Sequence, residues 1–503
     1  MKYTIRLLSI LLILALELSA DPILSSWFTK YSGQYARIYE TTADEAALNS
    51  VTTWSHPNNG SGQALPTYAG VHEIAYTETN VYIRTSGLGF HVMGPWYLDE
   101  ERTNLFPNYP SNTSAIFRFP RVPGAPPISK SATGNGTIGY FVDGIGMFDS
   151  RDAFSYSNSN EGDARPNSNF TGDGIWNRDA YINESVTFDS AHAHQAGINH
   201  HYHANPPALR HLIGDSVDYD ASTNTYTENF NGQHSPIMAW VRDGYPIYGP
   251  YGYDDPDDAT STVRRMITGY AIRDGSNGTT NLNDTGRTSL PSWAAVVQGI
   301  NATLTTNQFG PDVGEAYPLG HYIEDYDYLG HLGFTLGSDF DLDEHNGRFC
   351  KTPEYPDGIY AYFVSIDAQG TPTYPYNIGR TFYGSPTGAT VSTLPANAEI
   401  YFEGGPKAKL SIDSLQVEAT TGDVTLTWSG PEGGSYLIER CADLERWKIL
   451  DDTAVNEMGS LGSTPDSARA LDEAKQFYRA SLTTVEAFDD EGFDYDPIAF
   501  PNF

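Results

Sequence analysis

The sequence has 503 residues, enough for two to four domains. Acidic residues outnumber basic ones by 63 to 29, which gives a formal net charge of −34. A chain this acidic repels phosphate backbones, so nucleic acid is excluded as a partner. Hydrophobic residues make up 39% of the chain, which excludes a membrane-embedded protein, and 48 Gly and 31 Pro favour strands joined by many turns.

The N-terminus has the pattern of a secretory signal. Lys2 and Arg6 supply positive charge, and residues 7–16 form an apolar run that is too short to span a bilayer. Ala20 supplies a small residue at the expected cleavage point. The sequence therefore predicts a signal peptide over 1–20 and an exported protein. Its destination is extracellular, the cell surface or the periplasm, with no membrane span after the signal is removed.

Short strand and helix patterns follow along the chain. Thr42 and Glu45 form a capping-box pattern that predicts a short helix. β-branched and aromatic residues predict strands, and proline and glycine punctuation predicts two further short helices. The strands are expected at 81–85, 115–119 and 138–142, and the helices at 205–214 and 289–299. The predicted fold class is mostly β, a sandwich or distorted barrel with long loops and a few short helices.

The composition changes near Gly404, and the residues beyond it read as a small β-sandwich. Residues 424–428 have apolar side chains at every second position, the period of a half-buried strand. This region resembles the fibronectin type III-like modules of bacterial secreted proteins. The predicted domains are an N-terminal extension packed on the main domain, the main domain, the module and an acidic aromatic tail, over 21–69, 70–405, 408–483 and 484–503.

The chain has two cysteines, Cys350 and Cys441, which fall in different predicted domains. A disulfide scaffold is therefore excluded, and the fold must rest on packing. No phosphate-binding Walker loop, CxxC pair or Gly-x-Ser-x-Gly elbow is present, so the usual nucleophile routes have no support.

Six of the 13 histidines lie within twenty residues, between His192 and His211. Side chains at i and i+2 of a strand project from the same face. His192 with His194, and His201 with His203, are two such pairs, and residues 195–199 between them are short enough for a hairpin connection. Two antiparallel strands would then bring four imidazoles together. Imidazole is the common protein ligand of copper and zinc, so the pattern predicts a transition-metal site.

The predicted ligands fall into two groups. His194, His201 and His203 are the core ligands, and the reserve ligands are His192, His211 and His345. Carboxylates are expected to orient the imidazoles or to act as general acid and base. The residues expected around the ligands are Asp243, Asp343, Glu184, Asp189 and Tyr202.

Residues 339–348 offer a possible second cation site. Their alternating aspartates are similar to a calcium loop, but Glu344 occupies the sixth position, where an EF-hand needs glycine. An EF-hand is therefore not predicted here, and calcium binding in another geometry stays an alternative. His91 and Met93 form another i,i+2 pair that suits copper, for which a methionine buried in a core strand is the simpler explanation.

Residues 197–203, Gly-Ile-Asn-His-His-Tyr-His, resemble the signature of YHYH-domain proteins. Further segments agree with that family in order across roughly residues 70–400. They are 86–88, 94–96, 142–148, 243–249 and 342–348. The resemblance implies a secreted domain with a centre rich in histidine and tyrosine, and it implies no established reaction.

The chain departs from the family pattern at two places. His200 replaces the first tyrosine of the signature. A related late segment often carries Tyr-His-Tyr-His-like residues, whereas here residues 360–363 read Tyr-Ala-Tyr-Phe and cannot donate imidazoles. If the late segment completes a site in relatives, this chain has lost that part or fills it with His345 or His192.

Three functional hypotheses follow. The first is a secreted protein that binds copper or zinc. The second is a hydrolase or oxidase, using either an open metal position or histidine with Glu184 or Asp189, and a deep pocket beside the histidines would favour it. The third is adhesion at a cell surface or binding of extracellular polysaccharide, through exposed aromatics such as those at 245–253.

Overall fold

A computed structural model describes residues 21–165, 172–418, 420, 423–441, 448–455, 461–466 and 477–485. The predicted signal peptide and residues 486–503 of the predicted tail lie outside these residues. The fold is mostly β, as predicted, with six short α-helices among the described residues. These are α1 Pro22–Ser25, α2 Thr42–Ala47, α3 Ala180–Glu184, α4 Pro207–Leu212, α5 Leu282–Thr285 and α6 Ser292–Gln298. None of the helices in the described part of the chain is both long and apolar enough to cross a bilayer.

The helix predictions hold, with corrected ends. Thr41, not Thr42, caps α2, because its hydroxyl accepts a hydrogen bond from the Asp44 N–H. Pro206 takes the N-cap position of α4 and contributes no side-chain bond. Gly299 ends α6 in the left-handed conformation, as glycine at this position commonly does.

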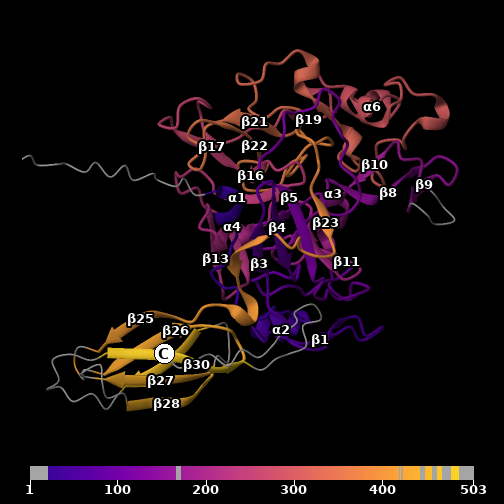
Figure 1. The fold of residues 1–503 in the computed structure, drawn as a ribbon. Coiled ribbons are helices and arrows are strands. Elements are labelled where there is room, and N and C mark those ends of the chain that lie inside the picture. The colour runs from indigo at the N-terminus through magenta and orange to yellow at the C-terminus, as the bar shows by residue number, and fades with distance from the viewer. Residues whose placement is uncertain are drawn as a thin grey trace, which may run out of the picture.

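Two large sheets build the main body (Figure 1). The five-stranded sheet has the order β23-β5-β4-β3-β24, and the eight-stranded sheet has the order β11-β12-β7-β6-β15-β16-β22-β21. The strands of the first are β3 Val71–Tyr76, β4 Asn80–Thr85, β5 Ala115–Pro120, β23 Ala389–Val391 and β24 Glu399–Glu403. Those of the second are β6 Gly139–Phe141, β7 Gly146–Met147, β11 Ala193–Ala196, β12 Asn199–Tyr202, β15 Ile237–Val241, β16 Pro246–Tyr248, β21 Gly347–Cys350 and β22 Ile359–Phe363.

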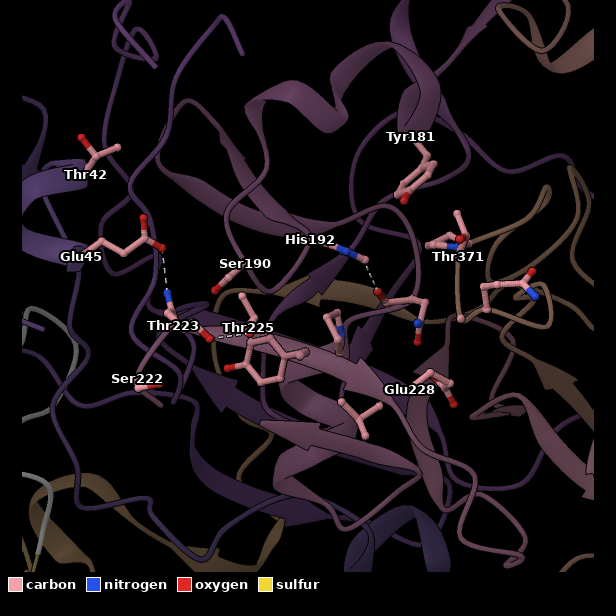
Figure 2. Close-up of a pocket in the computed structure, with 18 of the residues that line it drawn as sticks. Thr42, Glu45, Tyr181, Ser190, His192, Ser222, Thr223, Thr225, Glu228 and Thr371 are labelled. Carbon is pink, nitrogen blue, oxygen red and sulfur yellow. Dashed lines mark hydrogen bonds between the residues drawn. The ribbon is translucent and has the colours of Figure 1, made fainter. Parts of the chain in front are cut away.

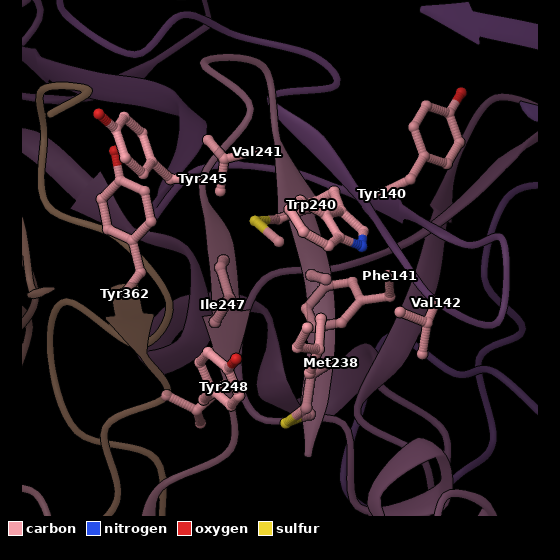
Figure 3. Packing of buried hydrophobic residues seen from close by; sticks show 14 of the residues in the cluster. Tyr140, Phe141, Val142, Met238, Trp240, Val241, Tyr245, Ile247, Tyr248 and Tyr362 are labelled. Carbon is pink, nitrogen blue, oxygen red and sulfur yellow. The ribbon is translucent and has the colours of Figure 1, made fainter. Parts of the chain in front are cut away.

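One hydrophobic core joins these sheets. Phe117 of β5 packs against Tyr140 of β6 with ring centroids 5.0 Å apart, and residues of both sheets belong to the same buried cluster. Figure 3 shows the side chains of Phe141, Met238 and Trp240 gathered around the β6–β15 pair. The arrangement is a sandwich-like pair of sheets, and no closed barrel occurs in the described residues.

The eight-stranded sheet consists of two similar four-stranded units. β6 pairs antiparallel with β7, β7 runs parallel to β12, and β12 pairs antiparallel with β11. The strands β15, β16, β22 and β21 repeat this pattern in the same order. The units meet at β6 and β15, where Tyr140 lies opposite Trp240. This pair therefore marks an approximate two-fold axis of the sheet.

The two units match residue by residue. Tyr202 is paired with Met147 in one unit, and Tyr362 is paired with Ile247 in the other. Each tyrosine donates to the aspartate of the hairpin turn in its own unit, Tyr202 to Asp143 at 3.1 Å and Tyr362 to Asp243 at 2.6 Å. Residues 200–203 thus correspond to 360–363, the late segment noted in the sequence.

Short strands in the connections complete the main body. They form a three-stranded sheet and four small two-stranded sheets. They are β1 Trp54–Ser55, β2 Gly62–Gln63, β8 Arg151–Ser157, β9 Gly162–Ala164, β10 Asn177–Asp179, β13 Val217–Asp220, β14 Thr225–Glu228, β17 Tyr251–Tyr253, β18 Val263–Arg265, β19 Tyr270–Ile272 and β20 Tyr326–Tyr328.

The C-terminal strands form a small sandwich of two three-stranded sheets, in the orders β25-β26-β29 and β28-β27-β30 (Figure 1). Trp428 and Tyr436 form its centre, with ring centroids 4.2 Å apart. The buried Glu432 links it to the N-terminal residues: it forms an ion pair with Arg37 and accepts from the Tyr35 N–H at 2.8 Å. The strands are β25 Ser411–Val417, β26 Val424–Ser429, β27 Gly434–Cys441, β28 Lys448–Val455, β29 Leu461–Asp466 and β30 Phe477–Val485. Cys350 and Cys441 are both buried.

Candidate metal centre

The histidine cluster lies on the hairpin formed by β11 and β12. Its turn consists of Gly197 and Ile198, and Gly197 has a φ of +63°, a conformation that favours glycine. The hairpin register places His194 directly opposite His201. His203 lies two residues beyond His201, on the same face, just after β12 ends. The sequence therefore brings three imidazoles together through one tight turn.

The three rings meet through their Nε2 atoms. The Nε2 atom of His201 lies 3.1 Å from that of His194 and 3.0 Å from that of His203. Three imidazoles bound to one tetrahedral zinc, with Zn–N bonds of about 2.0–2.1 Å, hold their nitrogens about 3.3 Å apart. The observed spacing is close to that value, and the predicted convergence of these three histidines is present.

The other ring nitrogen of each histidine faces an oxygen acceptor. His201 Nδ1 lies 3.0 Å from the Asn199 carbonyl, and His203 Nδ1 lies 2.8 Å from the Asp149 carbonyl. A carbonyl cannot donate, so both Nδ1 atoms must carry the proton.

His194 is fixed in the same tautomer by a hydroxyl. Its Nδ1 atom lies 2.7 Å from Thr187 Oγ1, and that hydroxyl donates its own proton to the Glu184 carbonyl at 2.6 Å. The hydroxyl can therefore only accept from the ring. All three rings consequently present Nε2 lone pairs to one another, which is unfavourable unless a cation lies between them.

The protein environment keeps these imidazoles neutral. Burial, together with the neighbouring histidines, lowers the pKa of His194 and His201 well below the ordinary value. Burial also lowers the pKa of His203. Phe148 stacks on the His201 ring with centroids 3.9 Å apart, which fixes its orientation. Neutral imidazole is the form that binds a metal ion, so the site is ready for one at neutral pH.

Glu184, at the end of α3, supplies a carboxylate beside the cluster. Its Oε2 atom lies 3.3 Å from His203 Nε2 and 3.6 Å from His194 Nε2. Burial and the nearby Asp152 raise the pKa of Glu184 to about 8. In the absence of a cation this side chain is therefore mostly protonated at pH 7. It is positioned either as a fourth ligand or as a proton carrier.

The cluster opens into a cavity of about 420 Å³. Polar and charged side chains share its wall with three phenylalanines. The residues that line the cavity include Phe106, Phe148, Phe154, Arg151, Arg165, Asp152 and Glu184. A metal ion held by the three Nε2 atoms would thus keep one side accessible to a small molecule, as catalytic zinc sites do.

His192 is placed elsewhere. It precedes β11 with a φ of +63°, so the strand alternation that pairs it with His194 does not apply. Its Nδ1 atom bonds to the Asn205 carbonyl at 2.9 Å, and its ring lines a separate polar pocket of about 850 Å³ (Figure 2). In Figure 2 this pocket is also bordered by Tyr181 and Glu228.

The other reserve histidines are also apart from the cluster. His211 bonds to the Val217 carbonyl at 3.0 Å and packs against Tyr219. His345 bonds to the Thr381 hydroxyl at 2.8 Å. Among the described residues, neither histidine belongs to a group of potential ligands that lie close enough together to bind one metal ion.

Asp243 and Asp343 were expected to orient imidazoles, and the structure assigns them a different contact. Asp243 accepts from the Tyr362 hydroxyl, and Asp343 accepts from the Tyr360 hydroxyl at 2.8 Å. Tyr202 bonds to Asp143 in the same way, on the face of the hairpin opposite His201. These hydrogen bonds stabilise the two sheet units, and none of them involves His194, His201 or His203.

The aspartates at 339–348 do not form a calcium loop. Asp341 is held by two bonds of 2.7 Å from Arg264, while Asp343 accepts from backbone N–H groups and from Tyr360. Their carboxylates are thus engaged separately. No group of carboxylates converges there in the part of the chain that the structure describes.

A second buried group contains His91, Asp189 and His200. No sequence pattern predicted that these three residues lie together. One potential ligand atom from each lies within 4.8 Å of the others. Asp189 was expected near the first cluster and belongs to this group instead, with Oδ2 3.6 Å from His91 Nε2. His91 lies about a hundred residues before His200, so no local spacing pattern connects them.

The aromatics at 245–253 do not form an exposed sugar-binding face. Tyr245, Tyr248 and Tyr251 are buried. Tyr248 packs on Phe363 with ring centroids 5.8 Å apart, and Tyr251 donates to Glu228 at 2.7 Å. They fill the interior around β16 and β17.

Comparison with known proteins gives one match. No curated protein and no solved structure matches the chain. The sequence model of the family described as YHYH protein matches residues 116–376, just over half of the 503 residues. The match includes the hairpin with its histidine cluster and both units of the eight-stranded sheet. The chain therefore belongs to the YHYH protein family.

Proposed function

We propose that this protein binds one transition-metal ion, copper or zinc, through the Nε2 atoms of His194, His201 and His203. The observation that carries the proposal is that the Nε2 atom of His201 lies 3.1 Å from that of His194 and 3.0 Å from that of His203, with all three atoms within 4.8 Å of one another. In each ring the Nδ1 atom faces an oxygen acceptor, which leaves the lone pair on Nε2. Such an acceptor holds the ring tautomer of metal-binding histidines in general.

Metal analysis tests this proposal. Purified full-length protein is stripped with a chelator, loaded separately with Zn²⁺ or Cu²⁺, desalted and assayed for bound metal. His201→Ala removes the central ligand and is expected to reduce the bound metal by one ion per chain. His211→Ala is the matched control, because His211 comes from the same stretch of sequence but bonds to Val217. Equal metal content in wild type and His201→Ala would refute the proposal.

The cavity favours a second candidate function, metal-dependent chemistry on a small molecule. Three protein ligands with an accessible fourth position are typical of catalytic zinc sites, and Glu184 is placed to hold or move a proton next to the ion. The class of activity is a hydrolase or an oxidase. Its test is a screen of ester, phosphoester and phenol substrates with loaded protein, comparing wild type with Glu184→Gln at equal metal content. No metal-dependent turnover in the screen would leave binding as the function.

We also propose the location and modular organisation of the chain. The basic residues and apolar run within 1–20 support export to the extracellular space, the cell surface or the periplasm. The two three-stranded sheets at 411–485 support a fibronectin type III-like module joined to the main domain. Such a module would serve as a spacer or as a docking unit for a cell surface or polysaccharide. Fractionation of cells that express the full chain, and a glycan-binding screen, test these two proposals.

A further inference from the structure

His200 lies on the opposite face of the hairpin from His201, and its environment is closed. His91, Asp189 and His200 are 8%, 4% and 2% exposed. Trp96 packs against the His200 ring with centroids 5.7 Å apart, and Tyr202 flanks the His91 ring. The group is therefore separate from the cavity that contains the first cluster.

The two imidazoles of this group form no close hydrogen bond. Both ring nitrogens of His200 and Nδ1 of His91 are buried without a partner, and His91 Nε2 has only Asp189 Oδ2, at 3.6 Å. Buried ring nitrogens without partners carry a substantial desolvation cost. Native structures rarely leave such atoms unsatisfied, and a bound ion is one arrangement that satisfies them.

Asp189 adds a buried carboxylate to the group. Its Oδ1 atom accepts from the N–H groups of Ala191 and Ala193, and its Oδ2 atom accepts from the Gly94 N–H at 2.9 Å. Oδ2 also faces His91 Nε2 at 3.6 Å. Asp189 alone can pair with His91 only, which leaves both nitrogens of His200 without a partner. A divalent cation satisfies the carboxylate and one nitrogen of each ring together.

The second unit of the sheet supplies an internal comparison. There the turn before β21 repeats the turn before β11: Asp343 Oδ1 accepts from the N–H groups of His345 and Gly347, as Asp189 Oδ1 does from Ala191 and Ala193.

The side chain opposite the aspartate differs between the units. Tyr360 occupies the position of His200 and donates its hydroxyl to Asp343 at 2.8 Å. The second unit thus satisfies its aspartate with a close hydroxyl, whereas in the first unit His91 approaches Asp189 only to 3.6 Å.

We propose that His91, Asp189 and His200 form a second, closed metal site that binds a divalent transition ion of the zinc type. Two imidazole nitrogens and one carboxylate oxygen are a ligand set that suits Zn²⁺. Because the site is closed, its ion is structural. It fixes the 86–96 loop to the hairpin, and it is independent of the proposed function of the first cluster.

Zinc stoichiometry of the full-length protein tests this site. After chelator treatment, incubation with Zn²⁺ and desalting, wild type is expected to retain two zinc ions per chain. His200→Tyr copies the residue at position 360 and gives Asp189 a hydroxyl partner, so it is expected to fold and to retain one. His201→Ala is also expected to retain one, and the double variant none.

The outcomes distinguish the two sites. If His200→Tyr retains as much zinc as wild type, the second site is refuted, whatever His201→Ala shows. If wild type holds one zinc that His200→Tyr loses and His201→Ala keeps, the second site stands and the proposed function fails. Should His200→Tyr not fold, His91→Asn decides in its place. Loading with Co²⁺ adds an independent readout, because loss of one site removes its part of the visible absorption.

Discussion

Replacement of Glu184 by glutamine gives a quantitative test of the first metal centre. The three imidazoles are neutral at pH 7 because their pKa values are lowered, so binding a metal ion displaces no proton from them. Glu184 is different, since its pKa is raised to about 8 and it must lose its proton to approach a cation. A group with that pKa is about 90% protonated at pH 7 and about 10% protonated at pH 9.

Zinc binding by wild type is therefore expected to release about 0.9 more protons than zinc binding by Glu184→Gln at pH 7, and about 0.1 more at pH 9. The same competition lowers the apparent zinc affinity of wild type about tenfold at pH 7 relative to pH 9, or about 1.4 kcal/mol. Calorimetric titration in buffers of different ionisation enthalpy measures the released protons. Taking the difference between the two proteins removes any contribution of metal-bound water and of the second site.

Two results would refute this reasoning. Equal proton release by wild type and Glu184→Gln would show that the carboxylate does not respond to the ion. An additional release of two or three protons that grows from pH 7 to pH 6 in both proteins would show that the imidazoles of the cluster are protonated before binding. That result would contradict the buried, neutral site.

Three further substitutions test other parts of the structure. Thr187→Val removes the acceptor of His194 Nδ1 and should weaken zinc binding about 10–100-fold in a chelator competition assay. It should also lower the stability by about 1–3 kcal/mol, because His194 Nδ1 and the Glu184 carbonyl lose their partner. Gly197→Ala meets no atom within 4 Å but places a side chain at a φ of +63°. Urea unfolding should therefore show a free energy of unfolding lower by about 1 kcal/mol. A decrease above about 3 kcal/mol would contradict a purely local backbone strain. Glu432→Ala leaves the buried Arg37 without its ion pair and should lower the free energy of unfolding by about 3–5 kcal/mol, measured by calorimetry. A decrease below about 1 kcal/mol would show that this ion pair does not stabilise the contact between the C-terminal sandwich and the N-terminal residues.

The first cluster could be anticipated because its geometry is local. A hairpin with a two-residue turn fixes which side chains share a face, and His194, His201 and His203 follow from that rule. His192 does not, because its positive φ takes it out of the strand, and strand periodicity carries no information about such a residue. Asparagine occupies the corresponding position 346 with a φ of 64°, so the turn, and not metal binding, explains the conformation there.

The second group could not be anticipated from spacing. His91 reaches Asp189 and His200 only through packing of the 86–96 loop on the hairpin, and such long-range contacts leave no periodic signal in the sequence. The repeat in the sheet was visible only in part, as the related late segment at 360–363. Its traces are an Asp-Gly turn at 143 and again at 243, and the similarity of Tyr-x-Tyr at 360 to His-x-Tyr at 200. The register of the strands makes the correspondence evident.

The paired units of the eight-stranded sheet bear on the order of folding and metal uptake. In the second unit Arg348, Ala361 and Phe363 stand where the first has its three cluster histidines, and the backbone forms the same strand pairing. That hairpin architecture thus forms without the three histidines. The backbone of the first unit is therefore expected to form before an ion arrives, so that the ion binds last to an already assembled hairpin. The ion taken up would then depend on the metals present around the finished protein, and copper would displace zinc wherever both are available.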